Sequence, residues 1–198
     1  MLNPGNRTVR VLSLLLVILI VGDFIGEHVV WSRLRQRERS RLDLAVQVAK
    51  VRQGLYEMER TVGKVAATGD IGHWYDSYKK WRDPTHDALF AMKDKLGGDA
   101  ALTATFEKLR KGIAGWDYFV HRLMSYPGAP GAKGYYSESP SVDGFDRNQI
   151  SLETISERID GICREDWQRA AKISSVLVGV AAVLALALGA LLVWGGRN

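Results

Sequence analysis

Residues 44–65 read LAVQVAKVRQGLYEMERTVGKV, and the apolar positions in this stretch alternate steps of four and three residues without a miss. These positions are Leu44, Val48, Val51, Leu55, Met58, Val62 and Val65. Such steps place one continuous apolar stripe along a helix, which is typical of coiled coils and helical bundles. The stretch therefore predicts a long helix whose stripe needs partner helices to cover it.

Three further stretches supply the partner stripes at helical spacing. Residues 102–123 repeat the unbroken pattern in Leu102, Phe106, Leu109, Ile113, Trp116, Val120 and Leu123. Residues 74–96 carry Trp74, Tyr78, Trp81, Leu89, Met92 and Leu96, and residues 152–162 carry Leu152, Ile155, Ile159 and Ile162. Together these stripes predict an all-α fold, an antiparallel up-down four-helix bundle.

Turn-forming residues separate the predicted helices. The first helix should end at 68–72, the second at 97–99 and the third at 125–128, with Asp99 placed to cap the third. Pro84 follows Asp83 inside the second pattern, which predicts a kink or a short break there. Residues 126–145 have turn composition throughout, so we expect a loop of that length.

Two stretches without charged residues, 11–21 and 173–194, predict membrane spans. The second is 22 residues long, which is enough to cross a hydrocarbon core of about 30 Å. The first continues through Asp23, Glu27 and the interfacial Trp31; we prefer an uncleaved anchor over 11–31 to a signal peptide. We therefore expect a two-pass protein of the bacterial inner membrane, with the bundle between the spans.

The charge distribution bears on partners and on orientation. The chain has 27 Lys and Arg against 22 Asp and Glu, and the signs are interleaved, which argues against nucleic-acid binding. Five arginines follow the first span, against Arg7 and Arg10 before it. By the positive-inside rule, this excess would place the domain between the spans in the cytoplasm. That domain has about 140 residues, and the rule is weak for it because long domains translocate largely regardless of charge.

The segment from Glu59 to Asp70, followed by residues 73–78, resembles the signature turn of the third class of CHASE sensory domains of bacterial signalling receptors. Glu59, Thr68, Gly69, Asp70 and Tyr78 stand at matching places. Residues 165–169 also resemble the stretch that leads the family's last helix into the membrane. The chain departs from the family at 63–66, where Gly-Lys-Val-Ala replaces the usual Arg-Gly-Tyr-Leu, and in the 126–145 loop.

The resemblance implies an extracytoplasmic sensory bundle over residues 32–172, and it decides the orientation. Residues 1–10 and 195–198 then form cytoplasmic tails. Family members usually continue into an output domain, whereas this sequence stops at residue 198. We therefore expect an input module that passes its signal to a separate histidine kinase or chemoreceptor. The alternatives are a structural or assembly membrane protein that uses the bundle for protein–protein contacts, and a cofactor-binding bundle.

A ligand site is expected in one layer of the bundle, where basic groups over aromatic rings could receive a small carboxylate. The candidate residues are Arg60, Lys64, Trp74, Tyr78, Trp81 and His121, with Tyr75, Tyr118 and Arg122 nearby. Core packing of the aromatic residues and solvation of the charges are the alternatives. Neither His86 nor His121 lies in a Glu-x-x-His pair, so we expect no metal or other cofactor. No catalytic motif is visible, and we expect no enzyme.

The lengths of the helices favour a parallel homodimer. The first helix, continuous with its span, should outreach the second and third, and this leaves a membrane-proximal stalk with two helices per chain. A monomer with a frayed juxtamembrane stretch is the alternative. Cys163 is the only cysteine of the chain, and we consider it either an interchain disulfide partner within the dimer or a small buried side chain.

Overall fold

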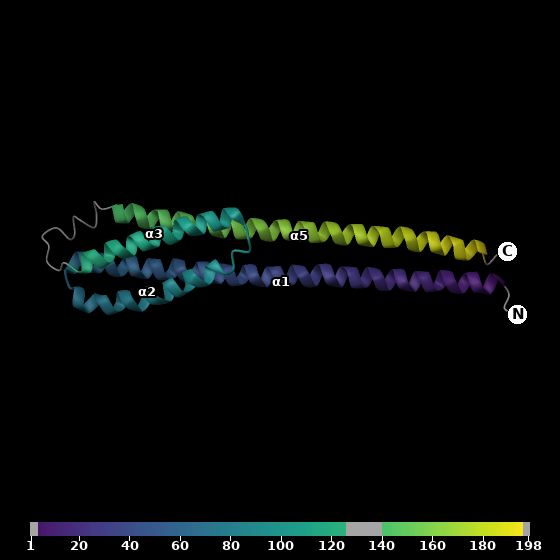
Figure 1. Cartoon of the computed structure of the whole chain (residues 1–198), viewed down its shortest axis with the longest axis horizontal. Coiled ribbons are helices and arrows are strands. Elements are labelled where there is room, and N and C mark those ends of the chain that lie inside the picture. The colour runs from purple at the N-terminus through teal and green to yellow at the C-terminus, as the bar shows by residue number, and fades with distance from the viewer. Residues whose placement is uncertain (1–3, 126–139, 196–198) are drawn as a thin grey trace. The chain divides into compact units, whose positions relative to one another are not determined.

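The computed structural model describes the backbone of residues 4–125 and 140–195. It contains four helices that pack against one another, and no strand is found in these ranges. The helices are α1 (Pro4–Thr68), α2 (Ile71–Lys93), α3 (Ala100–Ser125) and α5 (Pro140–Gly195) (Figure 1). The predicted all-α class is confirmed.

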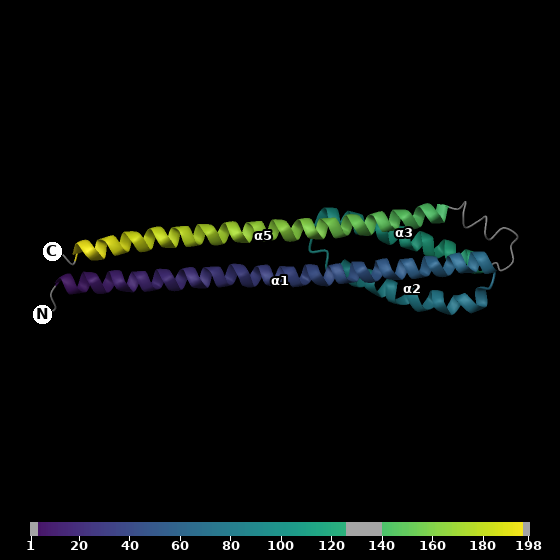
Figure 2. The same cartoon turned by 180° about the vertical axis from the view of Figure 1, so that it is seen from behind.

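The chain divides into two compact units, which α1 and α5 share. Unit 1 comprises Met1–Glu38 and Cys163–Asn198, and unit 2 comprises Arg39–Ile162. In unit 2, α2 and α3 lie alongside the second half of α1 and the first part of α5 in both views (Figures 1 and 2).

The core of unit 2 is built from the predicted stripes. All seven positions of the 44–65 stripe are buried, and so are the six positions of the α3 stripe from Leu102 to Val120. The predicted 74–96 and 152–162 stripes add these buried side chains: Tyr78, Leu89, Met92, Leu96, Leu152, Ile155, Ile159 and Ile162. Trp74 and Trp81 are half-buried and pack against this core. Apolar periodicity thus identified the buried faces correctly.

Caps and glycines lie at the helix ends that the sequence predicts, except that α2 already ends at Lys93, before the predicted 97–99. Asp70 caps α2 by accepting a hydrogen bond from the backbone N–H of His73 at 3.1 Å. Asp99 caps α3 in the same way, because its Oδ1 accepts from the N–H of Leu102 at 2.9 Å. Each cap contributes about 1 kcal/mol to stability. The turn between α1 and α2 needs the left-handed φ of 73° at Gly69.

The short break predicted at Pro84 is not found, because α2 runs through this residue as one helix, and the kink stays a prediction. Proline cannot donate the backbone hydrogen bond of this turn. The hydroxyl of the next residue, Thr85, donates to the carbonyl of Trp81 at 2.6 Å. Thr85 is also buried against Gly54 of α1, where an added Cβ would collide with the Thr85 hydroxyl. The packing of Thr85 against α1 and its hydrogen bond to Trp81 therefore hold α2 helical here.

The predicted 126–145 loop is too long at its second end. Helix α5 already begins at Pro140, and the ring of Phe145 lies 6.3 Å from that of Trp116. Contact with the core thus extends the helix over residues of turn composition. The remainder of the predicted loop, 126–139, lies outside the described residues.

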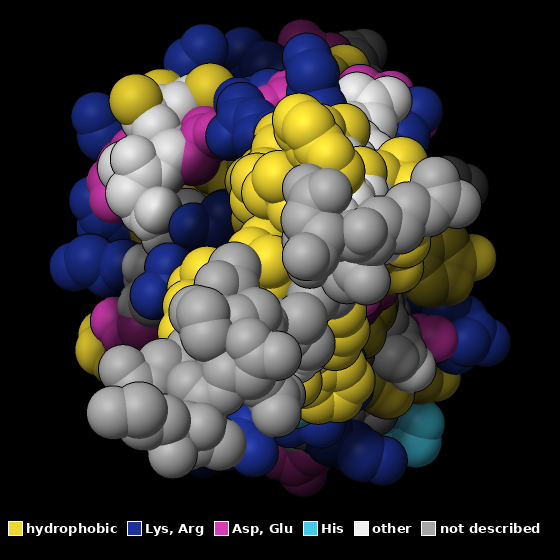
Figure 3. Space-filling model, turned by 90° about the vertical axis from the view of Figure 1, so that its right-hand side faces the viewer, with side chains coloured by type: hydrophobic (Ala, Val, Ile, Leu, Met, Phe, Trp, Pro, Cys, Tyr) yellow, Lys and Arg dark blue, Asp and Glu magenta, His cyan; other side chains and the backbone are white. Residues whose placement is uncertain are grey.

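Unit 1 contains the two apolar stretches. Both α1 and α5 are long and apolar enough to cross a membrane, and neither apolar window is buried in the structure. Helix α1 begins and α5 ends at the same end of unit 1 (Figures 1 and 2). Seen from that end, hydrophobic side chains gather at the centre of the view (Figure 3). Such exposed apolar surface is rare in water and usual in lipid.

Candidate functional site

Three side chains of α2 converge on one carboxylate of α3 in unit 2. Tyr78, Arg82 and His86 follow one another at four-residue steps and share a face of α2. Tyr78 Oη donates to Asp117 Oδ1 at 2.6 Å, and Arg82 Nη2 donates to Asp117 Oδ2 at 3.0 Å. Arg82 Nε donates to Oδ1, also at 3.0 Å. His86 Nε2 lies 3.6 Å from Oδ2, which is too long for a hydrogen bond. Tyr78 and Arg82 therefore make the hydrogen bonds that hold the Asp117 carboxylate.

This arrangement shifts the protonation equilibria of its members. Burial alone would raise the pKa of Asp117, but the neighbouring His86, Arg82 and Tyr78 override it and hold the pKa far below its ordinary value. Burial, followed by the hydrogen bond to Asp117, raises the pKa of Tyr78 above its ordinary value. The same carboxylate raises the pKa of Arg82. At neutral pH the cluster therefore holds an ionised Asp117–Arg82 pair and a neutral Tyr78 that donates its proton.

A pocket of about 480 Å³ opens beside this cluster on α2 and α3. Asp117 in its lining is already paired with Arg82, so the Lys79 ammonium is a further positive charge that Asp117 does not neutralise. Tyr75 and Tyr118 are partly exposed and offer ring faces. The full lining is Tyr75, Tyr78, Lys79, Arg82, His86, Ala114, Asp117, Tyr118 and His121. Cationic groups between aromatic rings suit a small carboxylate.

Of the six residues predicted to bind a ligand, Tyr78 and His121 line this pocket. Trp74 and Trp81 pack against the core instead, and Lys64 Nζ lies over the Trp74 ring, 4.3 Å from its centroid. Arg60 pairs with Glu57 on its own helix, with a 3.5 Å separation. These four residues are not part of the pocket lining.

The central residues Arg82 and Asp117 were missed as ligand-site candidates. The one available signal is the polar repeat at 78, 82 and 86, which marks a second face of α2 beside its apolar stripe. The partner of that face comes from α3, 35 positions along the chain from Arg82. The spacing of residues within one helix therefore does not predict the Arg82–Asp117 pair, which joins two helices.

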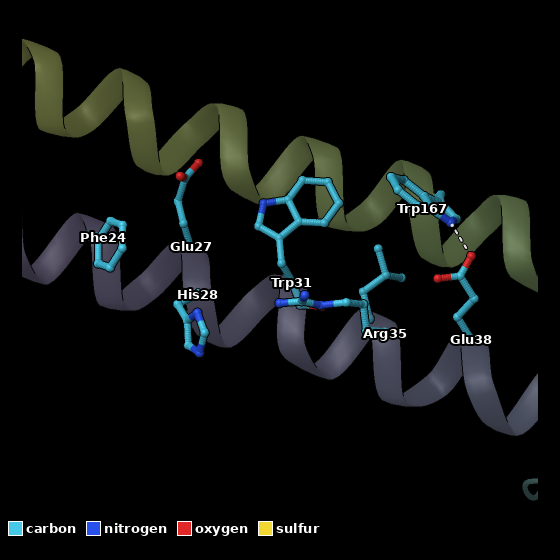
Figure 4. A pocket seen from close by; sticks show the side chains of 8 residues that line it. Phe24, Glu27, His28, Trp31, Arg35, Glu38 and Trp167 are labelled. Atoms are coloured by element: carbon cyan, nitrogen blue, oxygen red, sulfur yellow. Dashed lines mark hydrogen bonds between the residues drawn. The ribbon is translucent and has the colours of Figure 1, made fainter.

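A second pocket lies in unit 1, where α1 and α5 pass each other. The rings of Trp31 and Trp167 are 5.4 Å apart, and Trp167 Nε1 donates to Glu38 Oε1 at 3.5 Å (Figure 4). The pocket measures about 580 Å³. Its lining is Phe24, Glu27, His28, Trp31, Leu34, Arg35, Glu38 and Trp167. The sequence identified Trp31 as an interfacial residue but gave no role to Trp167.

The described residues contain no group of three or more His, Cys, Asp or Glu side chains that could hold a metal ion. Cys163 is half-buried on α5. Its pairing with a second chain stays a prediction.

No protein family, curated protein or solved structure matches this chain. The resemblance to CHASE sensory domains therefore stays a prediction from the residues that carry it, Glu59, Thr68, Gly69, Asp70 and Tyr78.

Proposed function

We propose that this chain is a membrane-anchored sensory input module whose bundle binds a small carboxylate in the α2–α3 pocket. The observation that carries the proposal is the convergence of Tyr78, Arg82 and His86 on Asp117 beside that pocket. A carboxylate near Lys79 would compete with Asp117 for the cationic groups of α2. Its binding would therefore favour a different position of α2 against α3.

We further propose that residues 32–172 form an antiparallel up-down bundle, with the spans at 11–31 and 173–194. Contacting pairs support this, because residue numbers rise along one helix as they fall along its neighbour. Between α1 and α2, Asp43 pairs with Lys95 and Gly54 lies against Thr85; between α3 and α5, Asp99 pairs with Arg158 and Gly112 lies against Asn148. With two spans, both ends of the chain would lie on the same side of the membrane.

The CHASE resemblance supports an extracytoplasmic bundle in the bacterial inner membrane. It also supports a histidine kinase or a chemoreceptor as the partner that receives the signal. A shift of α2 and α3 would reach this partner through small displacements of α1 and α5, which are continuous from the bundle into the spans.

A second copy of the chain is the other partner that we propose. Leu42, Val46 and Tyr56 are exposed on α1, and with Gln53 they follow heptad steps on the face opposite the buried stripe. Two copies anchored in one membrane would present these faces in parallel. In that register Arg52 of one copy would lie near Glu57 of the other, where their opposite charges attract.

The alternative function is that of a structural or assembly protein, and exposed apolar side chains on the bundle favour it. Phe90 is 71% exposed on α2 and Ile150 is 60% exposed on α5. A protein partner that covers these side chains would support this function. Proximity labelling in cells separates the two functions, because a kinase or receptor neighbour supports signalling and an envelope or secretion neighbour supports assembly.

The ligand proposal is tested by thermal unfolding of the purified full chain against a panel of small mono- and dicarboxylates. We expect at least one of them to raise the unfolding temperature in a saturable way. Lys79→Gln should weaken that effect, and Lys108→Gln, an exposed lysine of α3 outside the pocket, should not. Reporter fusions at both ends test the topology, and ends found outside the cytoplasm would contradict it.

A further inference from the structure

We propose that the Trp31–Trp167 pocket of unit 1 binds the headgroup of a zwitterionic phospholipid that carries a primary amine. The proposal rests on the placement of the two spans, and it is independent of the ligand proposed for the α2–α3 pocket. The pocket lies at headgroup depth. Trp167 precedes the charge-free stretch that begins at Ile173 by six residues, or about 9 Å of helix.

The order of chemical groups along α1 matches the order of groups in such a lipid. Phe24 lines the pocket at the end nearest the charge-free stretch 11–21, Arg35 lies farther out, and Glu38 is outermost (Figure 4). An acyl chain, a phosphate and a terminal amine follow one another in the same order. Trp31 stands between the two helices at the middle of this series.

The outer part of the pocket suits an ammonium group. Trp31 and Trp167 supply ring faces, which attract cations through their negative π surface. Glu38 accepts only a 3.5 Å bond from Trp167, so its carboxylate can take a stronger hydrogen bond from a primary ammonium. A quaternary ammonium has no N–H to donate. The carboxylate therefore favours a primary amine.

Arg35 is the group for the phosphate. Its Nε donates to the carbonyl of Trp31 at 3.4 Å, which keeps the guanidinium at the pocket wall. Guanidinium groups pair with phosphate oxygens through two parallel hydrogen bonds. On the inner side, Glu27 Oε1 accepts from Ser174 Oγ at 2.7 Å, which ties α1 to α5.

The charge of the lining argues against an anionic lipid. Glu27 and Glu38 contribute two negative charges, and Arg35 contributes one positive charge. A zwitterion places its phosphate at Arg35 and its ammonium at Glu38, whereas an anionic headgroup without an amine has no cation to offer Glu38.

The test uses native mass spectrometry of the full chain in detergent with equal concentrations of phosphatidylethanolamine, phosphatidylcholine and phosphatidylglycerol. We expect one phosphatidylethanolamine per chain to be retained in preference to the others. Glu38→Gln and Arg35→Gln should each weaken this binding by about tenfold, the effect of losing one charge-assisted hydrogen bond. Glu153→Gln, an exposed position of α5 in unit 2, is the matched control and should bind normally.

Trp31→Phe keeps an aromatic ring and should retain much of the binding, whereas Trp31→Ala should lose it. Circular dichroism checks that each variant is helical. Equal retention of all three lipids, preference for phosphatidylglycerol or phosphatidylcholine, or unchanged binding by Glu38→Gln and Arg35→Gln would overturn the proposal. These outcomes differ from failure of the sensory function, since the response of Glu38→Gln to carboxylates depends on the other pocket.

Discussion

The hydroxyl of Tyr78 lies 2.6 Å from Oδ1 of Asp117, and this contact joins the apolar core of unit 2 to its polar pocket. The Tyr78 ring is buried in one cluster with Met58 and Trp116, while its hydroxyl bonds to Asp117 in the pocket lining. A group that displaces Asp117 would therefore disturb a core residue as well. The same contact allows the pocket to be tested without knowledge of its ligand.

Tyr78→Phe should lower the free energy of unfolding by about 1–2 kcal/mol, because it removes a hydrogen bond to an ionised carboxylate but keeps the ring. Chemical denaturation of the full chain in detergent measures the change. Tyr118→Phe is the control, since Tyr118 is 70% exposed and its variant should unfold almost as the native protein does. Equal effects of both substitutions would show that the Tyr78 contact contributes little.

The pKa shifts predict how stability depends on pH. The pKa of Asp117 is lowered by folding, so its contribution is present above the unfolded pKa near ~4 and is lost as the pH falls toward the folded value. The pKa of Tyr78 is raised, so its contribution is present below the unfolded pKa near ~10 and is lost as the pH rises toward the folded value. The unfolding temperature should therefore fall at both ends of the pH range.

Two variants assign the two limbs of that profile. Asp117→Asn should flatten the acid limb, and Tyr78→Phe should flatten the alkaline limb, each in thermal unfolding followed by circular dichroism. An acid limb that keeps its slope in Asp117→Asn would place the titrating group elsewhere.

Local patterns in the sequence predicted the helices of unit 2 well. The stripe from Leu44 to Val65 is a property of one helix and requires no knowledge of its neighbours. The cap at Asp99 is equally local, because an N-cap residue bonds within the next turn. The short break offered as one outcome at Pro84 does not occur, since packing of Thr85 against α1 outweighs the local preference of proline.

The pockets depend on pairings that local patterns do not contain. The Asp117–Arg82 pair requires the register of α3 against α2, and the Trp31–Trp167 contact requires that of α5 against α1. Trp74 and Trp81 were named as ligand candidates with core packing as the alternative, because aromatic rings serve both cores and pockets. The structure places them against the core.

Gly54→Ala should destabilise unit 2 by about 1–3 kcal/mol, the usual effect of overpacking a core. The added Cβ would collide with the Thr85 hydroxyl, which is buried and held at 2.6 Å from the Trp81 carbonyl. Gly63→Ala on the same helix is the matched control, because a Cβ there meets nothing within 4 Å. It should stabilise by up to about 1 kcal/mol through helix propensity alone. Denaturant melts of the two variants should shift in opposite directions.

Gln53→Cys should form a disulfide-linked dimer on mild oxidation if the outward face of α1 pairs with a second copy. In a parallel pair, Gln53 meets its own symmetry mate at a central heptad position, whereas Leu42 and Val46 lie toward the membrane. Cys163→Ser provides the background, so that only the new thiol can cross-link. Lys108→Cys on α3 is the control for random collisions, because it is exposed outside this face. Gel electrophoresis without reductant measures the dimer fraction, and equal cross-linking of the two variants would exclude α1 as the dimer seam.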